Sequence, residues 1–169
     1  KLKKLIWLDI YFNQIRHLDE DIAKLQNLEI LYLSNNQFET LPKSLSKMVK
    51  LKEFYAHHNL LTSFPDISNL SKLQILSLNN NRLQEFPNSI LVIKHIKELD
   101  LSQNYISNFP EQIRNFESIK FLWLNDNRTD MQTLSYEKFK IALKEDFKQL
   151  IAFANILAVE VFPVPLGPV

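Results

Sequence analysis

LEILYLSNNQF, residues 28–38, decides the fold because it recurs in phase along most of the chain. The other copies are LIWLDIYFNQI from Leu5, LKEFYAHHNLL from Leu51, LQILSLNNNRL from Leu73, IKELDLSQNYI from Ile96 and IKFLWLNDNRT from Ile119. Their starts lie 22 or 23 residues apart, and all six fit the pattern LxxLxLxxN with mild substitutions. A fixed period of this length is the signature of a repeat architecture in which each repeat is one structural unit.

The alternation within each copy predicts a short strand. Counted from the first residue of a copy, positions 4 and 6 point to one side of a strand, and positions 3, 5 and 7 point to the other. In the second copy the inward pair is Leu31 and Leu33. One repeat cannot bury such a pair alone, so neighbouring repeats are expected to stack their strands into one parallel sheet over a continuous core.

A second pattern fills the return path between copies, as in LPKSLSKM from Leu41. Its apolar residues lie three apart, such as Leu45 and Met48, and this spacing predicts a single helical turn with one side packed inward. Prolines fix the chain where these turns begin. The third segment is one residue shorter between Pro65 and Ile67, so its turn is expected to differ from the others.

One asparagine ends every copy, and we interpret the set as a structural ladder. The six residues are Asn13, Asn36, Asn59, Asn81, Asn104 and Asn127. A side-chain amide donates two hydrogen bonds and also accepts. Each is therefore expected to satisfy backbone groups of the turn in its own repeat and in the next, as buried polar groups require.

The combined pattern, LxxLxLxxNxLxxLPxxIxxLxx, resembles the typical 23-residue class of the leucine-rich-repeat (LRR) family, over about residues 2–127. It is similar to repeats of Ras-group LRR proteins and of bacterial, including spirochaete, LRR proteins. The resemblance implies an α/β solenoid: a right-handed horseshoe with a parallel concave sheet and short helical turns on the convex side. It also implies protein–protein recognition rather than catalysis, and it favours a bacterial source with a role in virulence or host interaction.

The chain divides into a repeat solenoid over residues 1–130 and a C-terminal region over residues 131–169. A stripe of apolar residues from Tyr136 to Leu157 predicts an amphipathic helix, with Ser135 as its N-cap. This helix caps the solenoid or binds a partner independently. The apolar, proline-containing tail after it packs on the solenoid, binds a second copy or adds a strand to another chain. Leu2 stands where the last leucine of an earlier repeat would stand, so upstream sequence or a shielding partner is expected.

Composition excludes several function classes. A net charge of +1 gives no case for nucleic acid as a partner. The single glycine excludes glycine-rich phosphate loops, and the absence of cysteine excludes thiolate metal sites. No apolar run reaches the roughly 20 residues that span a bilayer. Ser34 and His57 share an outward column, but Asn79 follows them where a triad would need an acid, so we expect no enzyme activity, cofactor or metal.

Function is expected on the outward positions of the strands, where aromatic side chains gather. The predicted protein-binding residues are Trp7, Tyr11, Tyr32, Tyr55, His57, His58 and Trp123. Exposed aromatic residues in one area favour an interface. The competing interpretation is that Trp7 and Phe12 cover the N-terminal end, while Phe121 and Trp123 pack under the C-terminal helix.

Two functions follow from these features. The first is a non-enzymatic module that binds a protein ligand on the concave face. The alternative is a structural or self-associating surface protein, a homo-oligomer that assembles through the apolar tail and the open first strand. Sedimentation that depends on concentration would distinguish the second from the first. The location is a bacterial surface or the exterior if an upstream signal was removed, and otherwise the cytoplasm.

Overall fold

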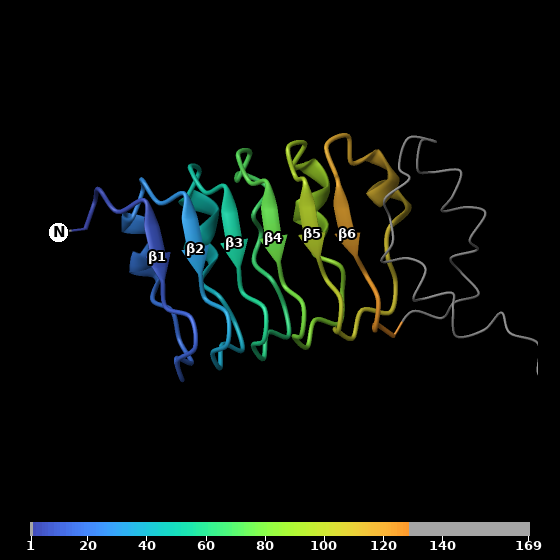
Figure 1. Cartoon of the computed structure of the whole chain (residues 1–169), viewed down its shortest axis with the longest axis horizontal. Helices are drawn as coiled ribbons and strands as arrows, with labels where there is room; N and C mark the ends of the chain where they lie inside the picture. The colour runs from blue at the N-terminus through green and yellow to red at the C-terminus, as the bar shows by residue number, and fades with distance from the viewer. Residues whose placement is uncertain (1, 129–169) are drawn as a thin grey trace, which may run out of the picture.

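Six short parallel strands, one from each repeat, form a single open sheet in the computed structural model, which describes residues 2–128 (Figure 1). The strands are β1 (Trp7–Asp9), β2 (Ile30–Tyr32), β3 (Glu53–Tyr55), β4 (Ile75–Ser77), β5 (Glu98–Asp100) and β6 (Phe121–Trp123). They follow one another in sequence order across the sheet. Equivalent positions pair directly, as Leu8 does with Leu31, so each repeat repeats the register of the one before. The predicted parallel sheet of an LRR solenoid is confirmed.

The core lies behind this sheet and runs through all the repeats. Leu31, Leu33 and Phe54 are fully buried, as the alternation predicts for positions 4 and 6. In the first repeat the equivalent Leu8 and Ile10 are only half-buried, since they have neighbours on one side alone. Burial by stacking is the main stabilising contribution in such arrays.

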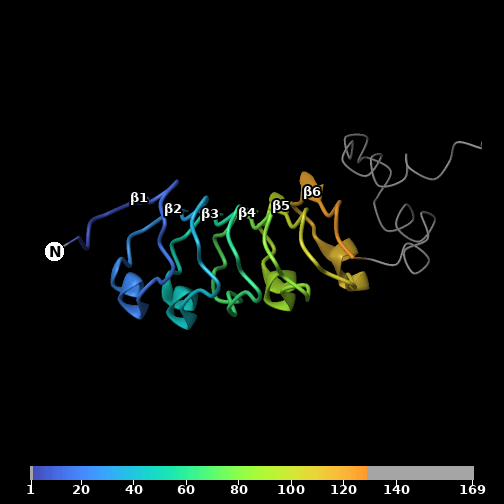
Figure 2. The ribbon, with the colours of Figure 1, turned by 90° about the horizontal axis from the view of Figure 1, so that it is seen from below.

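The return segments carry five-residue 3-10 helices on the side opposite the sheet (Figure 2). These are η1 (Glu20–Lys24), η2 (Lys43–Lys47), η3 (Asn88–Val92) and η4 (Glu111–Asn115). A proline immediately precedes η2, η3 and η4, while Asp19 precedes η1 and accepts a hydrogen bond from the Asp21 N–H at 2.7 Å. Between β3 and β4 the structure has no helix, whereas the segment that is one residue shorter predicted only a turn slightly different from the others.

The ladder asparagines connect each repeat to the one before it. Asn81 Nδ2 donates to the carbonyls of Ala56 at 3.0 Å and Leu78 at 2.9 Å, and its Oδ1 accepts from the Leu61 N–H at 3.0 Å. Asn36, Asn59, Asn104 and Asn127 make the same set of bonds. The connection therefore runs to the preceding repeat, whereas we expected it to run to the next. Asn13 is exposed, and its Nδ2 bonds only carbonyls of its own repeat.

The residue before each ladder asparagine has a left-handed backbone, a feature that the sequence analysis did not predict. Phe12, Asn35, His58, Asn80, Gln103 and Asp126 have φ between 51° and 55°. Asparagine and aspartate tolerate this region better than other non-glycine residues. Three of the six positions carry Asn or Asp, which is the signal that could have revealed the turn.

The predicted C-terminal cap helix and tail, residues 131–169, lie outside the described residues. Within residues 2–128, no helix has the length and apolar character needed to cross a membrane.

Candidate functional site

The outward side chains of the strands form two rows across the concave face. The register places position 3 in one row: Trp7, Ile30, Glu53, Ile75, Glu98 and Phe121. Position 5 forms the other: Asp9, Tyr32, Tyr55, Ser77, Asp100 and Trp123. Because adjacent parallel strands lie about 4.8 Å apart, neighbours within a row are in reach of one another.

An aromatic column, defined here as Trp7, Tyr32 and Tyr55, crosses the first three repeats. The rings of Tyr32 and Tyr55 stack with centroids 4.2 Å apart and planes 4° apart. The Trp7 ring lies 6.2 Å from that of Tyr32 at 56°, and its side chain is 58% exposed. The column therefore ends in a large aromatic surface that faces solvent.

Tyr55 also anchors the column by a hydrogen bond. Its hydroxyl donates to Glu53 Oε2 at 3.0 Å, within the same strand. Burial raises the pKa of Tyr55 strongly, and the neighbouring Tyr32 and Glu53 raise it further. The phenol therefore remains protonated and keeps donating across the physiological range.

The remaining predicted aromatic residues lie apart from the column. Trp123 stacks on Phe121 at the other end of the sheet, with centroids 5.6 Å and planes 10° apart. Tyr11 lies beside Phe12 at 5.9 Å, and both are exposed. The structure thus separates the predicted set into the aromatic column, two flanking pairs and the two histidines.

His57 and His58 lie side by side just beyond the end of β3, with ring centroids 5.2 Å apart. His57 is half-buried and His58 is exposed. Burial lowers the pKa of His57, and the neighbouring His58 lowers it further, while Asp100 opposes the shift. Neutral His57 is therefore favoured in the folded chain.

Asp100 is the acidic group near His57 that the sequence analysis missed when it found no acid in the column. Burial raises the pKa of Asp100, and hydrogen bonds from Ser102 oppose this. The Ser102 N–H and hydroxyl both donate to Asp100 Oδ1, at 3.0 and 2.7 Å. Asp100 lies two strands from His57 and in a different row, so a comparison of position 7 residues alone does not reveal it.

Position 7 is not exposed in every repeat. Ser34 is fully buried and Ser102 is 8% exposed. Across residues 2–128, Ser34 Oγ and His57 Nδ1 are the buried side-chain atoms without a hydrogen-bond partner. The same stretch holds no group of three His, Asp or Glu side chains arranged to bind a metal.

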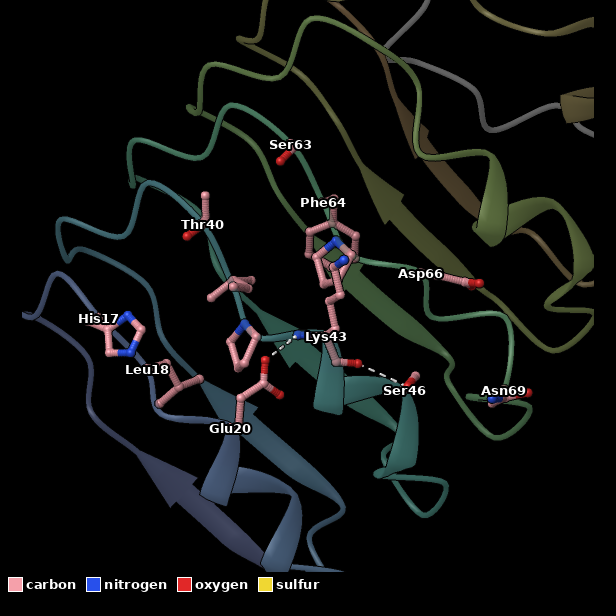
Figure 3. A pocket seen from close by; sticks show the side chains of 13 residues that line it. His17, Leu18, Glu20, Thr40, Lys43, Ser46, Ser63, Phe64, Asp66 and Asn69 are labelled. Atoms are coloured by element: carbon pink, nitrogen blue, oxygen red, sulfur yellow. Dashed lines mark hydrogen bonds between the residues drawn. The ribbon is translucent and has the colours of Figure 1, made fainter.

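A hollow of about 770 Å³ opens on the return side, next to the repeat that lacks a helix (Figure 3). His17, Glu20, Lys43 and Phe64 are among the residues that line it. Glu20 is already engaged, because its carboxylate accepts from the N–H groups of Lys43 at 3.2 Å and Ser44 at 2.8 Å at the start of η2. Hydrogen bonds from Ser44 lower the pKa of Glu20. This carboxylate caps the next repeat and is not free to bind a ligand.

Comparison with known families agrees with this geometry. The profile of the family described as Leucine rich repeat matches residues 1–61 and 71–128. The chain belongs to the leucine-rich-repeat family. A second profile, Leucine Rich repeats (2 copies), matches residues 49–90 of this LRR chain. The LRR fold is in general an interaction scaffold without enzymatic activity.

Three relatives show how the LRR chain compares with known proteins. It is 49% identical over 43 residues to the volume-regulated anion channel subunit LRRC8E of Homo sapiens, which covers 25% of this chain and 5% of that protein. A solved LRR protein of Leptospira interrogans has a TM-score of 0.69 and 36% identity, covering 71% of this chain and 31% of that one. The LRR ectodomain of the Arabidopsis thaliana receptor kinase GASSHO1/SCHENGEN3, in complex with CASPARIAN STRIP INTEGRITY FACTOR 2, has a TM-score of 0.68 and 26% identity. This match covers 75% of this chain and 16% of the receptor chain. The chain therefore spans less than a third of each relative.

Proposed function

We propose that this LRR chain is a non-enzymatic module that binds a protein ligand on its concave face, across the first four repeats. The observation that carries the proposal is the aromatic column, in which stacked Tyr32 and Tyr55 lead to an exposed Trp7. Stacking holds the two tyrosine rings in place, so less side-chain entropy is lost when a partner packs on them. Tyrosine and tryptophan are also the residues that most often dominate binding energy at interfaces.

The neighbouring side chains fit the same role. His57 and His58 extend the proposed contact area beyond the column at the end of β3. Tyr11 stands at its margin, where contacts contribute less, and Trp123 lies at the other end of the sheet. The plant ectodomain is a family member solved with a bound factor, and this supports ligand binding by the fold. The likeness to the Leptospira interrogans protein supports a bacterial source, which makes host proteins one class of ligand to test.

The test compares ligands captured by the immobilised 169-residue chain and by a Tyr32→Ala/Tyr55→Ala variant, with identification by mass spectrometry. The matched control is Lys47→Ala, an exposed residue on the return side. We expect the double variant to lose at least about 2 kcal/mol of affinity, roughly 30-fold, while its thermal melt stays intact. Equal affinity of the double variant and the wild type for every captured protein would place the site elsewhere.

A further inference from the structure

The concave face carries carboxylates and no permanent positive charge. Positions 3, 5, 7 and 8 of the six repeats hold no lysine or arginine, although the chain has 20 of these residues against 19 acidic ones. The same positions hold Asp9, Glu53, Glu98, Asp100 and Asp126. Basic residues are therefore excluded from these outward positions, although acidic residues occur both there and in the return segments.

These carboxylates have no basic partner within the described repeats. The ion pairs formed by residues 2–128 are Lys24–Asp21, Lys52–Glu29 and Arg114–Glu111. The first and third lie within η1 and η4, and the second lies just before the strands. Glu53, Glu98 and Asp100 are half-buried nonetheless. Charged groups that are partly removed from water and unpaired gain most from an external cation.

Strand β4 lies between these groups, and its outward face between Glu53 and Glu98 is called the trough here. Ile75 pairs with Glu53 on one side and Glu98 on the other, while Ser77 pairs with Tyr55 and Asp100. Glu53 and Glu98 thus stand two strand spacings apart, about 10 Å, with an apolar side chain between them. The Ser77 hydroxyl donates to Asn79 Oδ1 at 2.9 Å, so the floor satisfies its own polar group.

We propose that this trough along β4 binds an arginine side chain of the protein ligand, with its methylenes on Ile75 and its guanidinium between Glu53 and Glu98. The adjacent aromatic column then takes an apolar residue of the same ligand segment. A planar guanidinium with five donors can bond both carboxylates at once, which an ammonium group does less well. The inference rests on the proposed function and specifies the chemistry of the partner.

The surroundings of the trough favour a cation further. The Asp100 carboxylate lies beside Ser77, and burial raises its pKa, so a positive ligand group would stabilise its ionised form. Among the neighbouring titratable groups, His57 favours its neutral form and Tyr55 stays protonated. Neither supplies the missing positive charge at neutral pH.

The test uses two defined peptides that differ in one residue. Each contains a tryptophan and, after a short glycine linker, either arginine or glutamate. Backbone amide signals of the isotope-labelled 169-residue chain are followed by NMR as each peptide is added at millimolar concentration. We expect the arginine peptide to shift the signals of Ile75 and Ser77, and to lose this effect as salt is raised.

The variant Glu53→Gln/Glu98→Gln removes both charges and keeps the side-chain shape and the acceptor for Tyr55. We expect this variant to bind the arginine peptide about tenfold more weakly. The control Glu85→Gln/Glu117→Gln changes net charge equally at exposed residues of the return segments, and should change binding less than about twofold. The same spectra show whether each variant is folded.

Four results would overturn the inference. If both peptides shift the strand signals equally, the concave face binds ligands but does not select arginine, so the proposed function would stand without this inference. If the shifts map to the return segments, both the proposed function and this inference would fail. Absence of any shift, or unchanged binding by the Glu53→Gln/Glu98→Gln variant, would exclude an arginine site at the trough.

Discussion

Replacing Asn81 by leucine tests the asparagine ladder at its centre. The side chain is 5% exposed and makes hydrogen bonds of 2.9 to 3.0 Å with three backbone groups. Two of them, the Ala56 carbonyl and the Leu61 N–H, belong to the preceding repeat. Leucine has a similar size but bonds none of them, so the substitution removes the connection between repeats without leaving a large cavity.

The expected cost follows from the groups left unpaired. The Leu61 N–H has a single hydrogen to donate and lies in the core, so losing Asn81 Oδ1 costs about 1–3 kcal/mol. The two carbonyls at 2.9 and 3.0 Å lose one bond each, and each net contribution is about 0.5–1.5 kcal/mol. Part of this loss is recovered by burying the apolar leucine. We therefore expect a net destabilisation of about 3 kcal/mol.

Chemical denaturation with circular dichroism would measure this loss as a change of midpoint at constant slope. The matched control is Asn13→Leu, because Asn13 is exposed and bonds only the carbonyls of Ile10 and Tyr11 in its own repeat. Its expected cost is below about 1 kcal/mol. If Asn81→Leu and Asn13→Leu cost the same, or if Asn81→Leu costs much less than 1 kcal/mol, the ladder does not stabilise the stack as argued.

Three further predictions concern single residues. The pKa of Glu20 is lowered in the fold, so the stability that its carboxylate contributes is present above the ordinary glutamate pKa and is lost as pH falls. Glu20→Gln should therefore flatten the acid side of a plot of Tm against pH. An unchanged plot would contradict a stabilising bond from the Ser44 N–H to the Glu20 carboxylate. Burial lowers the pKa of His57, so its neutral form stabilises the fold above about pH 6.5, and this contribution falls as the pH is lowered. His57→Asn should reduce the dependence of Tm on pH in this range. His17→Asn, at an exposed site, should not reduce it. Phe12 has φ of 55° and is 75% exposed, so Phe12→Asn should raise stability by about 0.5–1 kcal/mol in thermal melts, and a loss would refute the strain argument.

The repeat pattern predicted the fold well because its physics is local and periodic. Leu31 and Leu33 have the spacing of an inward-facing strand, and the structure buries both. The shortened segment before Ile67 predicted a turn slightly different from the others, and the 3-10 helix is absent there. These features follow from residue spacing alone, and the same spacing recurs often enough to fix the register.

Details that depend on the turn geometry could not be read in the same way. Ser34 has the outward parity of a strand residue, but its side chain is fully buried, and the alternation of the sequence does not reveal this. The left-handed backbone at Phe12 and Gln103 is imposed by stacking, since neither residue favours it. The ladder direction depends on which turn lies within reach, which spacing does not specify.

The candidate site was predictable only in outline. Sequence indicated that Tyr32 and Tyr55 share a row, but the stacking of their rings and the bond to Glu53 required side-chain geometry. The relation between His57 and Asp100 crosses two strands and two rows, so no single column of the sequence contains it.

The missing helix in the third repeat has a mechanical consequence. On the convex side η1 packs against η2 and η3 packs against η4, but no helix lies between η2 and η3. When a solenoid bends, its outer side must stretch or compress, and resistance is lowest where a packed element is absent. We therefore expect changes of curvature to concentrate at the third repeat, whose strand carries Tyr55. The binding surface would then adjust its radius directly beneath the aromatic column, so ligands of different width could be accommodated without disturbing the asparagine ladder.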